Sequence, residues 1–283
     1  MEHYSALPGS DAEQVVKNIG IPPCPAILTK LLREMREDEP DLNKIGKLIG
    51  SDLSLAAAIL KTVNSPSYGL GTKVSSVHQA LNLIGLRNAA QLVTGLLLRN
   101  AFQGGSSHAM DEFWESSSTI ALLNASLARK LRVIDREEAY TFALFRDCGA
   151  LAMMVGARQY RPMLPGTSTM HGKHLIEFET ERYRVNHAVT GYYLTKSWHV
   201  PEPLCEAVLH HHHYIALHDG TLKMAASVRK HIALALAAQW LYVTRNLGVE
   251  CGEWKEGRAF ALETLGVSEA DLTAVVEELT RAA

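Results

Sequence analysis

Residues 41–56 read DLNKIGKLIGSDLSLA, and this stretch decides the fold class. Leucine or isoleucine occupies positions 42, 45, 48 and 49, a spacing that places apolar side chains on one face of a helix. Asp41 and Asp52 directly precede Leu42 and Leu53, where a carboxylate can accept hydrogen bonds from the first amides of a helix. The stretch therefore predicts two short, capped helices in succession.

The same helical pattern extends along the rest of the chain. Residues 28, 31, 32 and 35 form another apolar stripe, Asp135 precedes a third predicted helix, and Ser268 precedes the last one. No stretch alternates between apolar and polar residues in the way that a half-buried strand does. We therefore expect an all-α, multi-helix protein.

The composition of the chain indicates which partners it can bind and in which compartment it is found. The chain has 283 residues, 47% of them hydrophobic, with a formal charge of −2, so no global field attracts nucleic acid or an anionic membrane. The four cysteines are far apart, which is typical of reduced thiols. The first 20 residues lack the pattern of a signal peptide, and the longest apolar run, 232–243, falls short of the roughly 20 residues that span a bilayer. We expect a cytoplasmic protein that binds neither membrane nor nucleic acid.

Prolines and glycines divide the chain into three parts after an N-terminal extension, residues 1–20. Prolines at 22, 23 and 25 open a part made of short helices, residues 21–103. Longer helices follow in residues 109–214, including one expected to run from 136 to 155 without a break. Residues 215–283 are expected to form C-terminal helices that pack on the second part.

Four landmarks occur in order between residues 21 and 86. They read IPPCP at 21–25, IGSDLSLA at 49–56, VNSPSYG at 63–69 and VSSVHQALNLIGL at 74–86. Together they resemble the HDOD family, the HD-related output domains of bacterial signalling proteins, and the resemblance continues to about residue 214. It implies a fold like that of the HD phosphohydrolases, preceded by an N-terminal helical subdomain, and a role in signal transduction through protein partners.

The stretch FRDCG at 145–149 stands where an HD phosphohydrolase carries its His-Asp pair. The resemblance places the four core positions of the metal site at Ser116, Arg146, Asp147 and Ala238, of which only Asp147 is a metal ligand. Because adjacent residues on a helix do not face one another, we expect Arg146 and Asp147 to have separate partners. Arg146 is expected to repel a divalent ion and to form a structural salt bridge, or else to bind a phosphate or carboxylate ligand.

Histidines further along the chain are the other candidate metal or ligand remnants. His187 matches a histidine that can bind a second metal in related proteins, but at a helix start a capping or core role is the simpler interpretation. In the run 210–213, neighbours on a helix point about 100° apart, so at most two can share one site. We expect His211 and His212 to face inward and the other two to be solvated. No cofactor is expected beyond adventitious zinc or nickel.

The landmark at 63–69 has two interpretations. Asn64 and Ser65 can bond local backbone where a helix ends, and Gly69 permits a tight turn beneath Tyr68. Alternatively, Asn64, Ser65, Tyr68 and Gly69 form a contact surface for a partner.

Two classes of function follow from the sequence, while a third, nucleic-acid binding through the modest basic excess of the short N-terminal helices, is explained as well by lysines on solvated faces. The first is a non-catalytic regulatory module that binds signalling proteins such as a receiver domain, a kinase or a cyclic-dinucleotide enzyme. The second is a metal-dependent phosphohydrolase acting on nucleotides or cyclic dinucleotides. The loss of ligand residues at three of the four core positions favours the first.

Overall fold

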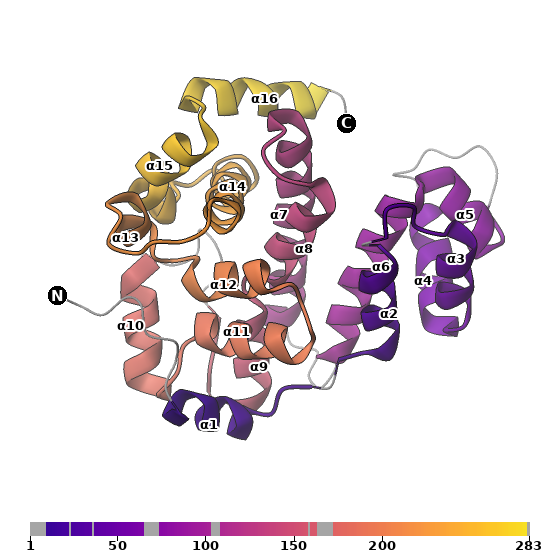
Figure 1. Cartoon of the computed structure of the whole chain (residues 1–283), viewed down its shortest axis with the longest axis horizontal. Helices are drawn as coiled ribbons and strands as arrows, with labels where there is room; N and C mark the ends of the chain where they lie inside the picture. The colour runs from indigo at the N-terminus through magenta and orange to yellow at the C-terminus, as the bar shows by residue number, and fades with distance from the viewer. Residues whose placement is uncertain are drawn as a thin grey trace. The chain divides into compact units, whose positions relative to one another are not determined.

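The computed structural model of the chain describes residues 10–22, 24–35, 37–64, 74–102, 108–157, 159–162 and 172–281 (Figure 1). Every regular element in these ranges is helical, and none of these residues lies in a strand. The predicted all-α class is therefore confirmed. The chain divides into two compact units, one formed by residues 23–103 and the other by residues 1–22 together with 104–283.

The unit 23–103 is built from short helices whose apolar stripes face its core. Its described residues form α2 (Ala26–Glu34), α3 (Leu42–Gly50), α4 (Leu53–Val63), α5 (Val77–Ile84) and α6 (Leu86–Ala101). The Asp41 carboxylate accepts from the amides of Asn43 and Lys44 (2.8 and 3.3 Å), and the Asp52 carboxylate accepts from the amide of Leu55 (3.1 Å). Both predicted caps are present at the starts of α3 and α4.

Asn64, which directly follows α4, bonds to the backbone of Val74. Its side-chain amide donates to the Val74 carbonyl and accepts from the Val74 amide, each at 2.8 Å. Asn64 therefore satisfies local backbone, the simpler of its two interpretations. The other residues of the possible partner-contact motif, Ser65, Tyr68 and Gly69, lie outside the described residues.

The larger unit is arranged around a buried central helix. Its described helices are α1 (Ser10–Ile19), α7 (His108–Leu131), α8 (Arg136–Phe145), α9 (Cys148–Gly156), α10 (Gly172–Tyr183), α11 (His187–Ser197), α12 (Glu202–His210), α13 (Tyr214–His218), α14 (Ala226–Tyr242) with a π-helical end at 243–247, α15 (Gly252–Leu265) and α16 (Glu269–Arg281). Helix α14 packs against α7, α8, α12 and α15 (Figure 1). Residues 232–238 of α14 are at most 1% exposed, so this helix forms the centre of the core.

The N-terminal residues are part of this unit. Helix α1 packs against α9 and α11, and its Val16 is 1% exposed. The indole Nε1 of Trp198, just after α11, donates to the Pro22 carbonyl (2.8 Å). Residues 10–22 therefore pack on the unit's core, whereas the sequence pattern had suggested an extension.

The continuous helix expected at 136–155 is instead two helices, α8 and α9, separated by a turn at residues 146–147. Gly149, at the start of α9, approaches α11 so closely that a Cβ there would lie 1.9 Å from the His187 carbonyl oxygen and 2.4 Å from the Gly191 amide nitrogen. Only glycine fits at this contact. The break and the close approach together bring Asp147 beside His187.

Among the described residues, no single helix is long and apolar enough to cross a bilayer. Helices α5 and α6 reach the required length and composition only as a pair that is bent by 117°.

Candidate metal centre

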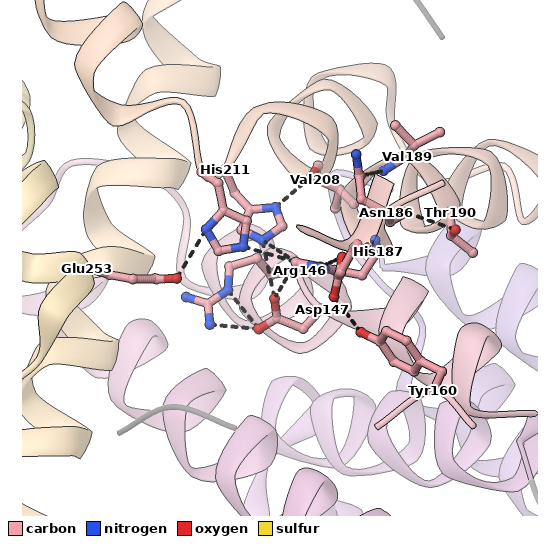
Figure 2. A network of polar contacts seen from close by, with 12 residues as sticks. Arg146, Asp147, Tyr160, Asn186, His187, Val189, Thr190, Val208, His211 and Glu253 are labelled. Carbon is pink, nitrogen blue, oxygen red and sulfur yellow. Dashed lines mark hydrogen bonds and ion pairs between the residues drawn. The ribbon is translucent and has the colours of Figure 1, made fainter. Parts of the chain in front are cut away.

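Three histidines and one aspartate of the larger unit converge on one point (Figure 2). Asp147 comes from the turn between α8 and α9, His187 is the first residue of α11, and His211 and His212 form the turn after α12. One ligand atom from each of the four lies within 4.8 Å of all the others. The three imidazoles are buried, at 6% exposure or less.

The atoms that face one another are the Nε2 atoms of the histidines and one carboxylate oxygen. His187 Nε2 lies 3.0 Å from His212 Nε2 and 3.3 Å from His211 Nε2. Asp147 Oδ1 lies 3.2 Å from His211 Nε2 and 3.7 Å from His187 Nε2. The set is three nitrogen donors and one oxygen donor, which suits zinc and other divalent transition metals.

The Nδ1 atoms on the far sides of the rings each face a proton acceptor. The Nδ1–H of His187 donates to Glu179 Oε2 (2.7 Å), and that of His211 donates to the Val208 carbonyl (2.6 Å). His212 Nδ1 lies 3.1 Å from Glu253 Oε1. Because a proton held on Nδ1 leaves the lone pair on Nε2, three lone pairs and a carboxylate oxygen point at one another. This arrangement can hold a cation, and carboxylate or carbonyl partners behind each histidine are typical of metal sites.

Local electrostatics points the same way. Burial opposes a charge on His187, but the carboxylates of Glu179 and Asp147 outweigh burial and raise its pKa, so the pocket attracts positive charge. Burial, assisted by the adjacent His212 ring, lowers the pKa of His211 to about 3, which keeps that imidazole neutral and able to ligate.

Arg146 contacts Asp147 directly, so the expectation of separate partners is wrong. The guanidinium, 4% exposed, donates to Asp147 Oδ2 through Nη2 (2.7 Å) and Nε (3.0 Å) (Figure 2). The expectation rested on a continuous helix, whereas the two residues lie in a turn, where their side chains can face the same side. Burial opposes ionisation of Asp147, but Arg146 and His211 hold the pKa of Asp147 well below its usual range.

The charged side chains around the cluster carry a net negative charge that a divalent ion could balance. Three carboxylates, those of Asp147, Glu179 and Glu253, surround the histidines, against the single guanidinium of Arg146. With neutral imidazoles the group carries two uncompensated negative charges, which a divalent cation would balance. Arg146 is bound to the Asp147 oxygen that faces away from the histidines, so it leaves Oδ1 available for an ion.

The other positions of the predicted HD core offer no ligand. The Ser116 hydroxyl, in α7, donates to the Phe113 carbonyl of its own helix (3.0 Å), and Ala238 is fully buried in α14. Helix α11 is capped by Asn186, whose side chain accepts from the Val189 amide (2.9 Å), so the ring of His187 is not needed for capping. His210 and His213 are half-buried with their rings 5.3 Å apart, so the expectation that they are solvated is wrong.

Two carboxylates of the site were missed in the sequence. Glu179 accepts from the Tyr160 hydroxyl (2.7 Å) as well as from His187, and Glu253 accepts from the Tyr214 hydroxyl (3.0 Å). Glu179 lies in α10, among other acids that face solvent, and no local pattern marks it as buried. Glu253 lies in α15, beyond the stretch in which the landmarks were found.

Comparison with known proteins identifies the family. A family model described as the HDOD domain matches residues 21–214 of the chain. The chain belongs to the HDOD family. Because the HDOD match ends at residue 214, α14, α15 and α16 lie outside it, and so does Glu253.

Two solved structures share the fold of this HDOD protein at low sequence identity, and one curated relative matches it in sequence. One structure, from Marinobacter aquaeolei VT8, carries a provisional name as a signal transduction protein. It superimposes with a TM-score of 0.71 at 16% sequence identity, and the match covers 96% of this chain and 62% of the Marinobacter chain. A candidate phosphohydrolase of Shewanella amazonensis SB2B gives 0.70 at 19% identity, over 98% and 95%. An uncharacterized protein of Treponema pallidum (strain Nichols) is 24% identical over 199 residues, 68% of this chain, which spans only 37% of that relative's length.

Proposed function

We propose that this protein is a non-catalytic regulatory module of bacterial signal transduction that holds one divalent transition-metal ion in a degenerate phosphohydrolase pocket. The observation that carries the proposal is the convergence of three Nε2 atoms and Asp147 Oδ1, with a proton acceptor behind every imidazole. Its residues fit a resident ion, because all three imidazoles are buried and each Nδ1 has a carboxylate or carbonyl oxygen within 3.1 Å.

The composition of the pocket argues against hydrolysis. A metal-dependent phosphohydrolase needs an ion with an open position, where bound water becomes hydroxide near neutral pH. The four protein donors would match the four ligands that zinc prefers, which is the pattern of closed, structural sites. The donors that would hold another ion are replaced by Ser116, Arg146 and Ala238.

The buried guanidinium supplies the charge that a second ion would otherwise bring. Arg146 neutralises Asp147 Oδ2 through two hydrogen bonds, so the carboxylate is satisfied on that side without metal. A fixed cation cannot polarise a water molecule as a metal does, and a catalytic role for this half of the pocket is therefore disfavoured.

A regulatory role then rests on the recognition of other proteins. Membership of the HDOD family supports it, as does the fold shared with a neighbour named for signal transduction. The partners that we propose are receiver domains, kinases or cyclic-dinucleotide enzymes of the same cell.

The proposal is tested on protein purified without a histidine-affinity column. Metal content is measured on the same sample that is screened for phosphohydrolysis in manganese, with nucleotides and cyclic dinucleotides as substrates. We expect one ion per chain and no turnover. Turnover that the Asp147→Ala variant abolishes would establish the hydrolase instead. A pull-down with receiver domains and kinases, with and without chelator, tests the regulatory part, and retention of none of them counts against it.

A further inference from the structure

The candidate metal site formed by Asp147, His187, His211 and His212 is in contact with a part of the chain that lies outside the HDOD match. Glu253, in the first turn of α15, is 7% exposed and uses both carboxylate oxygens on residues next to the cluster. Oε1 lies 3.1 Å from His212 Nδ1, and Oε2 accepts from the Tyr214 hydroxyl (3.0 Å). Figure 2 shows Glu253 reaching the cluster from the α15 side, opposite Tyr160.

The helix that carries Glu253 is held against the same short segment by packing. A Cβ on Gly257 would lie 2.8 Å from Tyr214 Cγ, and the Phe260 ring lies 6.5 Å from the Tyr214 ring. Residues 253, 257 and 260 are spaced at i, i+4 and i+7, so they share one face of α15. That face therefore covers His212 and Tyr214 with one carboxylate, one glycine and one aromatic ring.

Helix α15 also forms a wall beside the site. A cavity of about 210 Å³ is lined by His212 and by Glu256 of α15, together with Asp219 and Thr221. The position of α15 and the environment of the ligand histidine are thus physically connected.

We propose that Glu253 is a positioning residue for the metal centre, and that ion binding and the docking of α15 onto the core are thermodynamically coupled. This inference rests on the proposed metal site. A carboxylate behind a ligand histidine fixes the ring orientation and makes Nε2 a stronger donor. Coupling between two binding events is reciprocal. The free energy by which docked Glu253 strengthens ion binding therefore equals the free energy by which the bound ion stabilises the docking of α15.

The test measures the affinity of the full chain for Zn²⁺ by competition with a chromophoric chelator. Glu253→Gln removes the charge and keeps the shape, and is expected to weaken Zn²⁺ binding by about 10- to 100-fold. Glu263→Gln is the matched control, because Glu263 lies on the same helix but pairs with His218 at the surface. Its affinity is expected to equal that of the unmodified chain.

Hydrogen exchange supplies a second, independent readout of the coupling. Added Zn²⁺ is expected to slow amide exchange in residues 252–265 of the unmodified chain, and this protection is expected to disappear in Glu253→Gln. Tyr214→Phe, which removes only the hydroxyl that donates to Glu253, is expected to weaken Zn²⁺ binding in the same direction by a smaller factor.

The possible outcomes separate the two proposals. If the unmodified chain binds Zn²⁺ and Glu253→Gln binds it equally well, the coupling is wrong and the metal site stands. If the unmodified chain binds no Zn²⁺, the metal site and the coupling both fail. Loss of affinity in Glu253→Gln, without loss in Glu263→Gln, supports both.

Discussion

At the scale of single residues, the substitution of arginine for histidine changes what the neighbouring aspartate does. Asp147 Oδ2 accepts a hydrogen bond from the Arg146 guanidinium, while Oδ1 faces His187 and His211. The arginine therefore neutralises one side of the carboxylate without blocking the other. In the sequence, the histidine of the His-Asp pair is replaced by Arg146. In the structure, three other histidines and one oxygen of Asp147 still converge on one point.

Arg146 is expected to matter for stability because it is buried and paired. Arg146→Met leaves the Asp147 carboxylate without its strongest partner and should lower the free energy of unfolding by about 3 kcal/mol. The exposed pair of Arg258 with Glu269, 3.9 Å apart, provides the control. Arg258→Met should cost less than about 0.5 kcal/mol. Urea unfolding of both variants in chelator measures the difference, and equal effects would contradict the account.

Restoring the motif is not expected to restore the chemistry. Arg146→His recreates the His-Asp pair, but Ser116 and Ala238 still supply no ligands at their positions. We expect this variant to remain inactive in the same phosphohydrolase screen. If Arg146→His hydrolysed a substrate, the remaining donors would suffice for catalysis. The substitution of arginine for histidine would then be the sole cause of the lost activity.

At the scale of elements, the helix starts could be predicted and one helix break could not. Asp41, Asp52 and Asp135 each accept from the amide groups of the helix that follows, as their sequence positions indicated. The break at 146–147 has only weak local signals, Asp147 and Gly149, because residues 136–155 contain no proline and are apolar enough for one helix. The cause is tertiary, since Gly149 meets the backbone of α11.

The contact between α9 and α11 is expected to be essential for the site. Gly149→Ala would place a methyl group against the His187 carbonyl and the Gly191 amide, backbone atoms that cannot turn aside. We expect a loss of about 3 kcal/mol in stability and weaker metal binding, because His187 moves away from Asp147. Gly50→Ala in α3 meets no atom within 4 Å and should be harmless. Urea unfolding and chelator competition measure both effects, and a stable Gly149→Ala variant with unchanged affinity would disprove the argument.

At the scale of the whole molecule, the site is assembled from segments far apart in the chain. The turn at 146–147, the start of α11, the turn after α12 and the start of α15 each contribute a side chain. Resemblance to a family could select Asp147 and His187, and the run of four histidines suggested His211 and His212 as candidates. Neither could find Glu179 or Glu253, because their partners are set by packing and, for Glu253, because α15 lies beyond the matched residues.

Metal removal is expected to destabilise one unit selectively. All four tryptophans of the chain, at 114, 198, 240 and 254, lie in the larger unit, so their fluorescence reports on that unit alone. At an ion concentration about 1,000 times its dissociation constant, binding contributes about 4 kcal/mol, or a melting shift on the order of 10 °C. We expect chelator to lower the fluorescence melting temperature by this amount. An unchanged melting temperature would show that no ion stabilises the unit.

X-ray absorption at the metal edge of the zinc-loaded protein tests the central claim most directly, because it counts the ligands of the ion. We predict a single zinc with four nitrogen or oxygen neighbours near about 2.0–2.1 Å, imidazole scattering from three histidines, and loss of one imidazole in His211→Ala. A second metal at about 3.5–4 Å, or fewer than three imidazoles in the unmodified protein, would contradict it.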